Sequence, residues 1–106
     1  MINLVDLTKL SLDLANNNVE DDSIIKVFES LVNLENLNDV YLDLRDGEIT
    51  NAGFDAIIDD LAELNCSVVL DIRENYDILE AEWLVEDLED NIEVLYDTRF
   101  KSSWIL

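Results

Sequence analysis

Several residue types that build common active sites are missing or scarce in this sequence. It contains no histidine and no proline, one cysteine and two glycines, and only six basic residues among 106. Without histidine, the chain lacks the usual general base of neutral pH and can form neither a serine–histidine triad nor a histidine zinc site. Cys66 stands alone, so no internal disulfide or cysteine metal cluster is possible. We therefore expect no catalytic residues, no metal site and no cofactor.

The glycines and carboxylates give no stronger sign of catalysis. Gly47 and Gly53 lie in one short stretch, so the chain has no glycine-rich phosphate loop. A calcium loop of the EF-hand type also fails, because placing Gly47 at its turn puts Leu42 and Leu44 where oxygen ligands are required. Acidic residues are so numerous that pairs suited to acid–base catalysis arise by chance. The sequence predicts a protein that is not an enzyme.

Negative charge dominates the chain. It carries 26 acidic residues against six basic ones, a formal charge of −20. Like charges repel over roughly 8 Å at physiological salt, so nucleic acids and anionic membranes are not expected as direct partners, whereas a basic protein surface would be attracted. The first residues show no basic segment followed by a long apolar run, so we expect no signal peptide and no membrane span. Together with the single cysteine, this favours a cytoplasmic protein.

Apolar residues recur along the chain with a spacing of about thirty positions. The matching pairs are Leu7 and Leu37, Leu10 and Val40, Leu12 and Leu42, Leu14 and Leu44, Val19 and Ile49, Ile24 and Phe54, and Leu31 and Leu61. A repeat of this length predicts an array of similar supersecondary units. We expect a single domain over residues 1–106, with units at about 4–35, 36–65 and 66–91 and a terminal strand and cap at 92–106.

Each unit is predicted to be a strand followed by a helix. Alternating apolar residues indicate strands at Leu10, Leu12 and Leu14, at Val40, Leu42 and Leu44, and at Val68, Leu70 and Ile72, with a fourth near 94–98. Spacings of three and four indicate helices at Ile24, Val27, Phe28 and Leu31, at Phe54, Ile57, Ile58 and Leu61, and at Ala81, Leu84, Val85 and Leu88. The order β-α-β-α-β-α-β predicts an α/β fold of three to four βα repeat units, with a mostly parallel sheet and helices on one side.

Two of these units resemble the leucine-rich repeat in its longer helical variety. The matching pattern is Leu7-x-x-Leu10-x-Leu12-x-Leu14 in the first unit and Leu37-x-x-Val40-x-Leu42-x-Leu44 in the second. The stretch from Gly47 to Gly53 is similar to the turn that leads into the helix of that family. The resemblance covers about residues 4–65, and it implies a repeat shape that binds proteins without indicating which partner.

Outward residues of the four expected strands fall into columns when the strands are aligned by their inward residues. The columns are Ser11, Tyr41, Val69 and Leu95; Asp13, Asp43, Asp71 and Asp97; and Ala15, Arg45, Arg73 and Arg99. Neighbouring strands lie ~4.8 Å apart, so adjacent aspartates repel. In one interpretation, diagonal Asp–Arg pairs neutralise this face. In the other, it recognises a protein or peptide through Tyr41, Asp43, Arg45, Val69, Asp71, Arg73, Asp97 and Arg99.

Acidic residues on the second and third predicted helices form another candidate surface. They are Asp55, Asp59, Asp60, Glu63, Glu82, Glu86, Asp87 and Asp90, and no basic residue accompanies them. Such a charge run can simply keep a protein soluble. It can also imitate nucleic-acid phosphates and occupy the basic cleft of a nuclease or other nucleic-acid-binding protein. In charge and length the chain is similar to small phage anti-restriction and anti-CRISPR proteins and to the acidic immunity proteins of nuclease toxins.

These two surfaces give two functional hypotheses. The first is a non-catalytic inhibitor whose partner is a basic protein, such as a nucleic-acid-binding enzyme. The alternative is a leucine-rich-repeat scaffold that recognises a protein or peptide through its exposed sheet face.

Three smaller features also carry expectations. Trp83 lies off the helical stripe, so it either packs under a neighbouring loop or marks a contact surface. Cys66 is expected to be a small buried filler. The apolar end of the chain, from Phe100 to Leu106, is expected to fold back as a cap or to form a homodimer contact.

Overall fold

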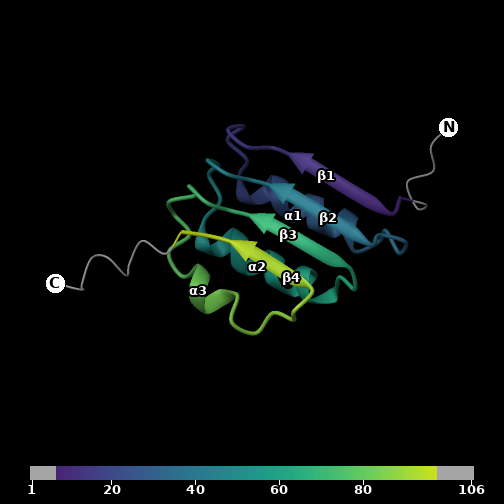
Figure 1. The fold of residues 1–106 in the computed structure, drawn as a ribbon. Helices are drawn as coiled ribbons and strands as arrows, with labels where there is room; N and C mark the ends of the chain where they lie inside the picture. The colour runs from purple at the N-terminus through teal and green to yellow at the C-terminus, as the bar shows by residue number, and fades with distance from the viewer. Residues whose placement is uncertain (1–6, 98–106) are drawn as a thin grey trace.

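Strands and helices alternate along the chain in the predicted order (Figure 1). The structure is a computed structural model, and it describes residues 7–97. The elements are β1 (Lys9–Asp13), α1 (Asp21–Leu31), β2 (Asp39–Asp43), α2 (Asn51–Glu63), β3 (Ser67–Asp71), α3 (Ala81–Leu84) and β4 (Ile92–Leu95). Arg99 and the apolar end of the chain at residues 100–106 lie outside the described residues. Within residues 7–97, no helix is both long and apolar enough to cross a membrane.

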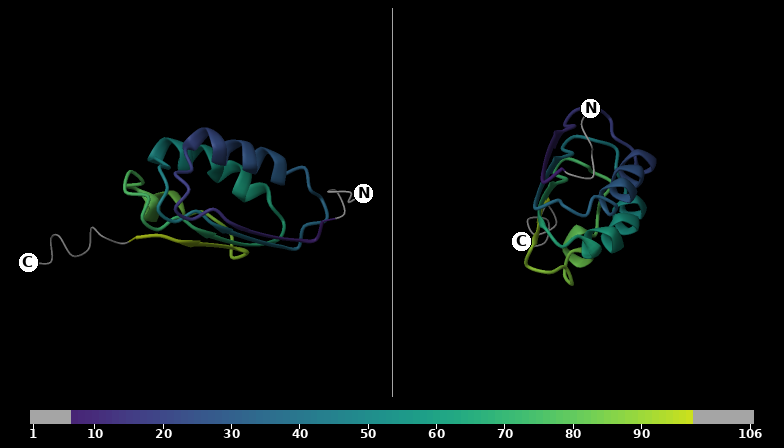
Figure 2. Two further views of the ribbon diagram at one scale, coloured as in Figure 1. Left: turned by 90° about the horizontal axis from the view of Figure 1, so that it is seen from above. Right: turned by 90° about the vertical axis from the view of Figure 1, so that its right-hand side faces the viewer.

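The four strands lie parallel in one sheet, in the order β1-β2-β3-β4. Lys9 lies opposite Asp39 and Asp39 opposite Ser67, so the first two repeats are 30 and 28 residues long. Val68 lies opposite Ile92, so the third repeat is 24 residues long. Figure 2 shows α1 and α2 over one face of the sheet, while the other face is open. The predicted α/β fold class, with its repeated βα units, is therefore confirmed.

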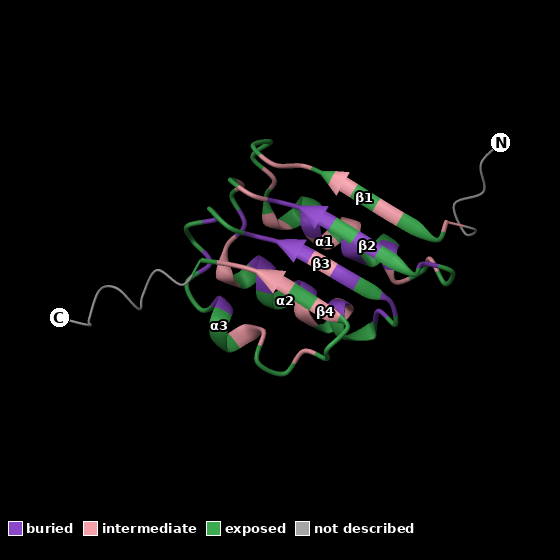
Figure 3. Cartoon of the chain, viewed as in Figure 1, coloured by how far each residue is buried: buried purple, intermediate pink, exposed green. Residues whose placement is uncertain are grey.

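The core lies between the sheet and the helices. Alternate strand residues face inward, and α1 and α2 direct apolar stripes toward them, with Phe28 and Phe54 fully buried. Burying a side chain of this kind stabilises the fold by roughly 1.5–3 kcal/mol. The central strands β2 and β3 are more deeply buried than the edge strands β1 and β4 (Figure 3). The other fully buried apolar side chains are Ile24, Leu42, Leu44, Ile49, Ile57, Leu61, Val68 and Leu70.

The third helix is shorter than the sequence predicts. The apolar spacing from Ala81 to Leu88 favours a helix of at least two turns, whereas α3 ends at Leu84 and a loop with turns follows. The acidic residues of that loop are Glu86, Asp87, Glu89 and Asp90. They would lie at the negative end of the helix dipole, where carboxylates destabilise a helix, and no basic residue is near in sequence to offset them. The predicted helical placement of Glu86, Asp87 and Asp90 is therefore wrong.

Strand β4 begins two residues earlier than the sequence predicts. Val69 lies opposite Glu93, and Asp71 lies opposite Leu95. The sequence columns instead match Val69 with Leu95 and Asp71 with Asp97. The short α3 explains the difference, because a shorter third repeat returns the chain to the sheet sooner. Asp97 therefore lies beyond the aspartate row.

Side chains at the helix starts tie successive repeats together. Thr50 precedes α2, and Asp21 is the first residue of α1. The Asp21 carboxylate accepts hydrogen bonds from the Thr50 backbone N–H at 2.8 Å and from its hydroxyl at 2.6 Å. Asn51, the first residue of α2, repeats this arrangement: its Oδ1 accepts from the amides of Leu79 and Glu80 at 2.7 and 3.1 Å. A side chain of each repeat thus accepts hydrogen bonds from backbone amides at the start of the next helix. Such amides need a partner from outside, because the first amides of a helix have none within it.

Gly53→Ala is expected to destabilise the protein although alanine favours helices. Gly53 lies in the first turn of α2, and its amide donates to the Thr50 hydroxyl at 3.4 Å. A Cβ atom on Gly53 would overlap the Asp21 carboxyl group and lie 2.7 Å from the Asp21 Cβ. Helix propensity alone would stabilise the variant by up to about 1 kcal/mol. Because Asp21 must move, we expect the free energy of unfolding, measured in urea, to fall by about 1–2 kcal/mol.

The same substitution in an Asp21→Gly background is the control for Gly53→Ala. Both the carboxylate and the Cβ atom of residue 21 are absent there, so alanine should raise the free energy of unfolding by about 0.5–1 kcal/mol. Stabilisation in both backgrounds would show that the contact with Asp21 does not require glycine.

Candidate functional site

The open face of the sheet brings three aspartates into one row. Asp13, Asp43 and Asp71 are the last residues of β1, β2 and β3 and are paired in register. Leu95 takes the fourth place, in β4. Carboxylates on neighbouring strands repel one another, and burial strengthens the repulsion because water screens it less. The row therefore needs positive groups nearby.

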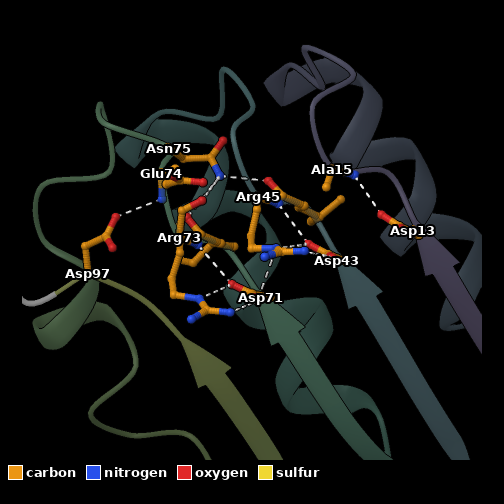
Figure 4. Close-up of polar contacts among 11 residues, drawn as sticks. Asp13, Ala15, Asp43, Arg45, Asp71, Arg73, Glu74, Asn75 and Asp97 are labelled. Carbon is orange, nitrogen blue, oxygen red and sulfur yellow. Dashed lines mark hydrogen bonds and ion pairs between the residues drawn. The ribbon is translucent and has the colours of Figure 1, made fainter.

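Asp43 and Asp71 are buried although they lie on the open face. They are 3% and 1% exposed, whereas Asp13 on the edge strand is exposed. Each buried carboxylate is bound at both oxygens by the arginine two residues further along the chain (Figure 4). Arg45 Nε and Nη2 lie 2.9 and 2.8 Å from Oδ1 and Oδ2 of Asp43. Arg73 makes the equivalent bonds to Asp71 at 2.9 and 2.6 Å.

Arg45 also joins the two central strands, because its Nε lies 3.7 Å from Oδ2 of Asp71. We call Asp43, Arg45, Asp71 and Arg73 the Asp–Arg cluster. The hydrogen bond from Arg45 lowers the pKa of Asp43 below its usual value of 3.8, against the opposing effect of burial. The hydrogen bonds to Asp43 and Asp71 raise the pKa values of Arg45 and Arg73. Asp43 and both arginines therefore stay charged at neutral pH.

The arginines neutralise the buried aspartates, as one of the two sequence interpretations expects, but the geometry differs. The closest pairs run along each strand, and one diagonal pair, Arg45 with Asp71, joins the two strands at 3.7 Å. Asp97 takes no part in the cluster, and Arg99 lies outside the described residues. Because Asp43 and Asp71 are covered, a partner at this face would meet the arginine side chains and not the carboxylates.

The chain leaves each of the first three strands through a turn of the same backbone shape. Asn16, Asp46 and Glu74 all have positive φ angles, of 62°, 54° and 63°. The Asn16 amide donates to the Arg45 carbonyl at 3.0 Å, and the Asp46 amide makes the equivalent bond in the next repeat at 3.1 Å. At Glu74 the Asp97 carboxylate takes the place of that carbonyl and accepts the amide at 2.8 Å. Asp97 is thus a positioning residue for the third turn.

Asn75 is a buried polar residue that the spacing of apolar residues does not reveal. Its Nδ2 donates to the carbonyls of Leu44 and Ile72 at 2.8 and 2.9 Å. Its Oδ1 accepts from the Ile49 amide at 3.1 Å. Asn75 therefore fastens the turn after β3 to the turn after β2. Gly47 makes room for it, since a Cβ atom there would lie 2.8 Å from Oδ1 of Asn75.

Asn75→Ala is expected to lower the free energy of unfolding by about 3 kcal/mol, because buried backbone groups lose their partner. Asn17 is the matched control, since it occupies the equivalent place in the first repeat but is exposed, where it donates to the Ala15 carbonyl at 3.0 Å. Asn17→Ala should cost less than about 0.5 kcal/mol. Urea denaturation measures both values, and equal losses would contradict the role assigned to Asn75.

The Asp–Arg cluster should make stability depend on pH in the acid range. Because the pKa of Asp43 is lower in the folded protein than its usual 3.8, ionised Asp43 stabilises the fold above that value. This contribution is lost as the pH falls through the folded pKa. The difference in unfolding free energy between the wild type and Asp43→Asn should therefore be largest near neutral pH and shrink below about pH 4.

Asp13→Asn is the control for this pH dependence, because Ala15 stands there in place of the arginine. Its difference from the wild type should be small throughout, and urea denaturation at a series of pH values measures both differences. A difference in unfolding free energy between the wild type and Asp43→Asn that stays constant with pH would contradict the ionic contribution of the cluster.

A groove of about 410 Å³ lies on the open face, nearer the start of the strands than the cluster. Its lining includes Lys9, Ser11, Asp39, Tyr41 and Val69. Tyr41 is 39% exposed, so its ring is available to a partner. The structure thus brings Tyr41 and Val69 together, as the sheet-face interpretation expects, and leaves Asp97 apart from them.

The second predicted site covers α2 and the α3 region, and we call it the acidic surface. Asp55, Asp59 and Glu63 are exposed and recur every four residues, so they form one row along α2, about 6 Å apart in helix rise. No lysine or arginine occurs in residues 46–72 or 74–98. The remaining members are Asp60, which is half-buried, and Glu82, Glu86, Asp87 and Asp90, which are exposed.

Other chemistry-bearing groups in the described chain are accounted for. Cys66 is buried, as predicted, and its burial raises the pKa of the thiol, which lowers its reactivity. In residues 7–97, no group of three or more histidine, cysteine or acidic side chains is placed to hold a metal ion. Every buried side-chain nitrogen or oxygen of those residues has a hydrogen-bond partner. These residues therefore contain no unpaired buried polar side-chain atom of the kind that a bound ligand would satisfy.

Comparison of the chain with protein-family models, with curated proteins and with solved structures found no match. The resemblance to the leucine-rich repeat therefore stays a prediction, and so does the likeness to phage-encoded inhibitors. The fold and the geometry of the two surfaces are the basis for a functional proposal.

Proposed function

We propose that this protein is a non-catalytic inhibitor that acts in the cytoplasm and blocks a basic nucleic-acid-binding protein by charge mimicry. The acidic surface would enter the positively charged cleft of the target and compete with its nucleic acid. Long-range attraction would speed the encounter, and the counterions released from the two charged surfaces would favour binding, as those released from phosphates do when a protein binds nucleic acid.

The observation that supports this proposal is the separation of charge between the two faces. Arg45 and Arg73 make their ion pairs within the Asp–Arg cluster, and both lie on the open face. The row of Asp55, Asp59 and Glu63 has no cation in its own helix. Like charges at this spacing destabilise a helix by a few tenths of a kcal/mol per pair. Cations on a basic partner would attract these carboxylates and offset the repulsion between them.

The open face supports a second candidate function, a scaffold that recognises a peptide or protein. Its groove of about 410 Å³ and the half-exposed ring of Tyr41 are the specific observations in favour. Aromatic residues and arginines are common anchors in protein interfaces. Binding of this kind would depend on Tyr41 and Arg73 and would change little with salt.

Charge mimicry predicts salt-sensitive binding that depends on the acidic surface. The immobilised protein should capture a basic nucleic-acid-binding protein from a cell lysate at low salt and release it at moderate salt. A variant with Asp59→Asn, Glu63→Gln, Glu86→Gln and Asp87→Asn should bind the captured protein at least about tenfold more weakly, because several charge contacts are lost together. Gel-shift assays should show that the wild type displaces nucleic acid from the target.

The matched control removes four charges from the first repeat instead. Its substitutions are Glu20→Gln, Asp22→Asn, Glu29→Gln and Glu35→Gln, all at exposed positions. This control should keep the affinity of the wild type within about threefold, the effect of lower net charge alone. Equal losses in both variants would contradict a specific acidic surface. Capture that survives high salt but fails in Tyr41→Ala would favour the scaffold.

A further inference from the structure

A groove lies within the acidic surface, between the start of α2 and α3. Its volume is about 300 Å³. That value is at the lower end of the range for ligand pockets, so the groove suits one side chain better than a whole small molecule. Its lining residues are Asn51, Ala52 and Asp55 from α2 and Glu80, Trp83 and Leu84 from the α3 region.

Trp83 is the largest side chain of this groove and is 68% exposed. The interpretation that it packs under a neighbouring loop is therefore wrong, and the alternative of a contact surface remains. An exposed indole next to carboxylates is suited to a cation, because the face of the ring carries partial negative charge. Arginine gains most from such a site, since its flat guanidinium stacks on the ring and still donates hydrogen bonds at its edge.

Asp55 and Glu80 are the acidic residues that line the groove, one from each side. The Asn51 side chain fixes the Glu80 side, because its Oδ1 accepts from the Glu80 amide at 3.1 Å and its Nδ2 donates to Oε1 of Glu80 at 3.3 Å. The groove is thus held by bonds between α2 and the residue that precedes α3. A site that is already formed loses less entropy when it binds.

We propose that this groove binds the guanidinium group of one arginine on the basic partner, stacked on Trp83 and paired with Asp55 and Glu80. Charge complementarity supports this occupant, because residues 46–72 and 74–98 contain no basic residue that could fill the groove from within. The inference rests on the proposed function for the class of partner, and it adds the chemical group that is recognised.

Anisotropy measurements with labelled, end-blocked oligo-arginine and oligo-lysine peptides of equal length test the proposal on the full chain. The two peptides have equal charge, so the acidic surface alone should not distinguish them. We expect oligo-arginine to bind about threefold to fivefold more tightly. Trp83→Leu removes the ring and Ala52→Met fills the groove, both without a change in charge. Each should weaken arginine binding about fivefold and abolish the preference for arginine.

Ala62→Met is the matched control, because residue 62 is also exposed on α2 but lies about 15 Å from Ala52 along the helix. It should retain both the affinity and the preference of the wild type. Circular dichroism checks that all three variants keep the fold. Equal binding of the two peptides by the wild type, or a preference that persists in both Trp83→Leu and Ala52→Met, would overturn the proposal.

Failure of this inference can be distinguished from failure of the proposed function. Asp59, Glu63, Glu86 and Asp87 lie outside the groove lining, so the variant that replaces them tests the charge surface alone. If that variant loses the lysate partner while Trp83→Leu retains it in full, the result supports the proposed function and contradicts arginine binding in the groove. If the groove prefers arginine but no nucleic-acid-binding protein is captured, the result supports arginine binding in the groove and contradicts the proposed function.

Discussion

The structure depends on neutralising carboxylates that a parallel repeat necessarily stacks together. When parallel strands pair in register, an aspartate that recurs in each repeat forms a row across the sheet, because neighbouring strands lie ~4.8 Å apart. Asp43 and Asp71 occupy such a row and are buried. An arginine two residues later lies on the same face of the chain, so it can bind both oxygens of its own aspartate. Without these arginines the central strands would bury uncompensated charge, which is strongly destabilising.

This solution determines where the negative charge of the molecule lies. Two of the six basic residues are bonded into the Asp–Arg cluster, on the face opposite to the helices. They cannot also neutralise the carboxylates of α2 and α3. The cluster itself is balanced, so the excess charge lies outside it, much of it on the helices and the turns. The same two arginines therefore make the sheet possible and are not available to the carboxylate row of α2.

Periodicity in the sequence predicted the strands, the first two helices and the pairing of arginine with aspartate. It failed where the repeat length changed: matching Asp97 and Arg99 to the earlier Asp-x-Arg pattern placed the fourth strand two residues too late. Apolar spacing also overestimated α3, because it takes no account of charge at a helix end. Asn75 was missed because its partners come from separate segments. The recurrence of asparagine at Asn17 was the one available signal.

The shortening of α3 and the groove beside it have a common physical cause. Carboxylates after Leu84 disfavour further helical turns, because they would face the negative end of the dipole without cations to offset them. The chain therefore turns back to β4 after a single turn of helix, and only that turn flanks the start of α2. Trp83 stays exposed there, beside Asp55 and Glu80. The scarcity of basic residues thus limits α3 to one turn, which shapes the groove, and it leaves the groove with acidic residues in its lining.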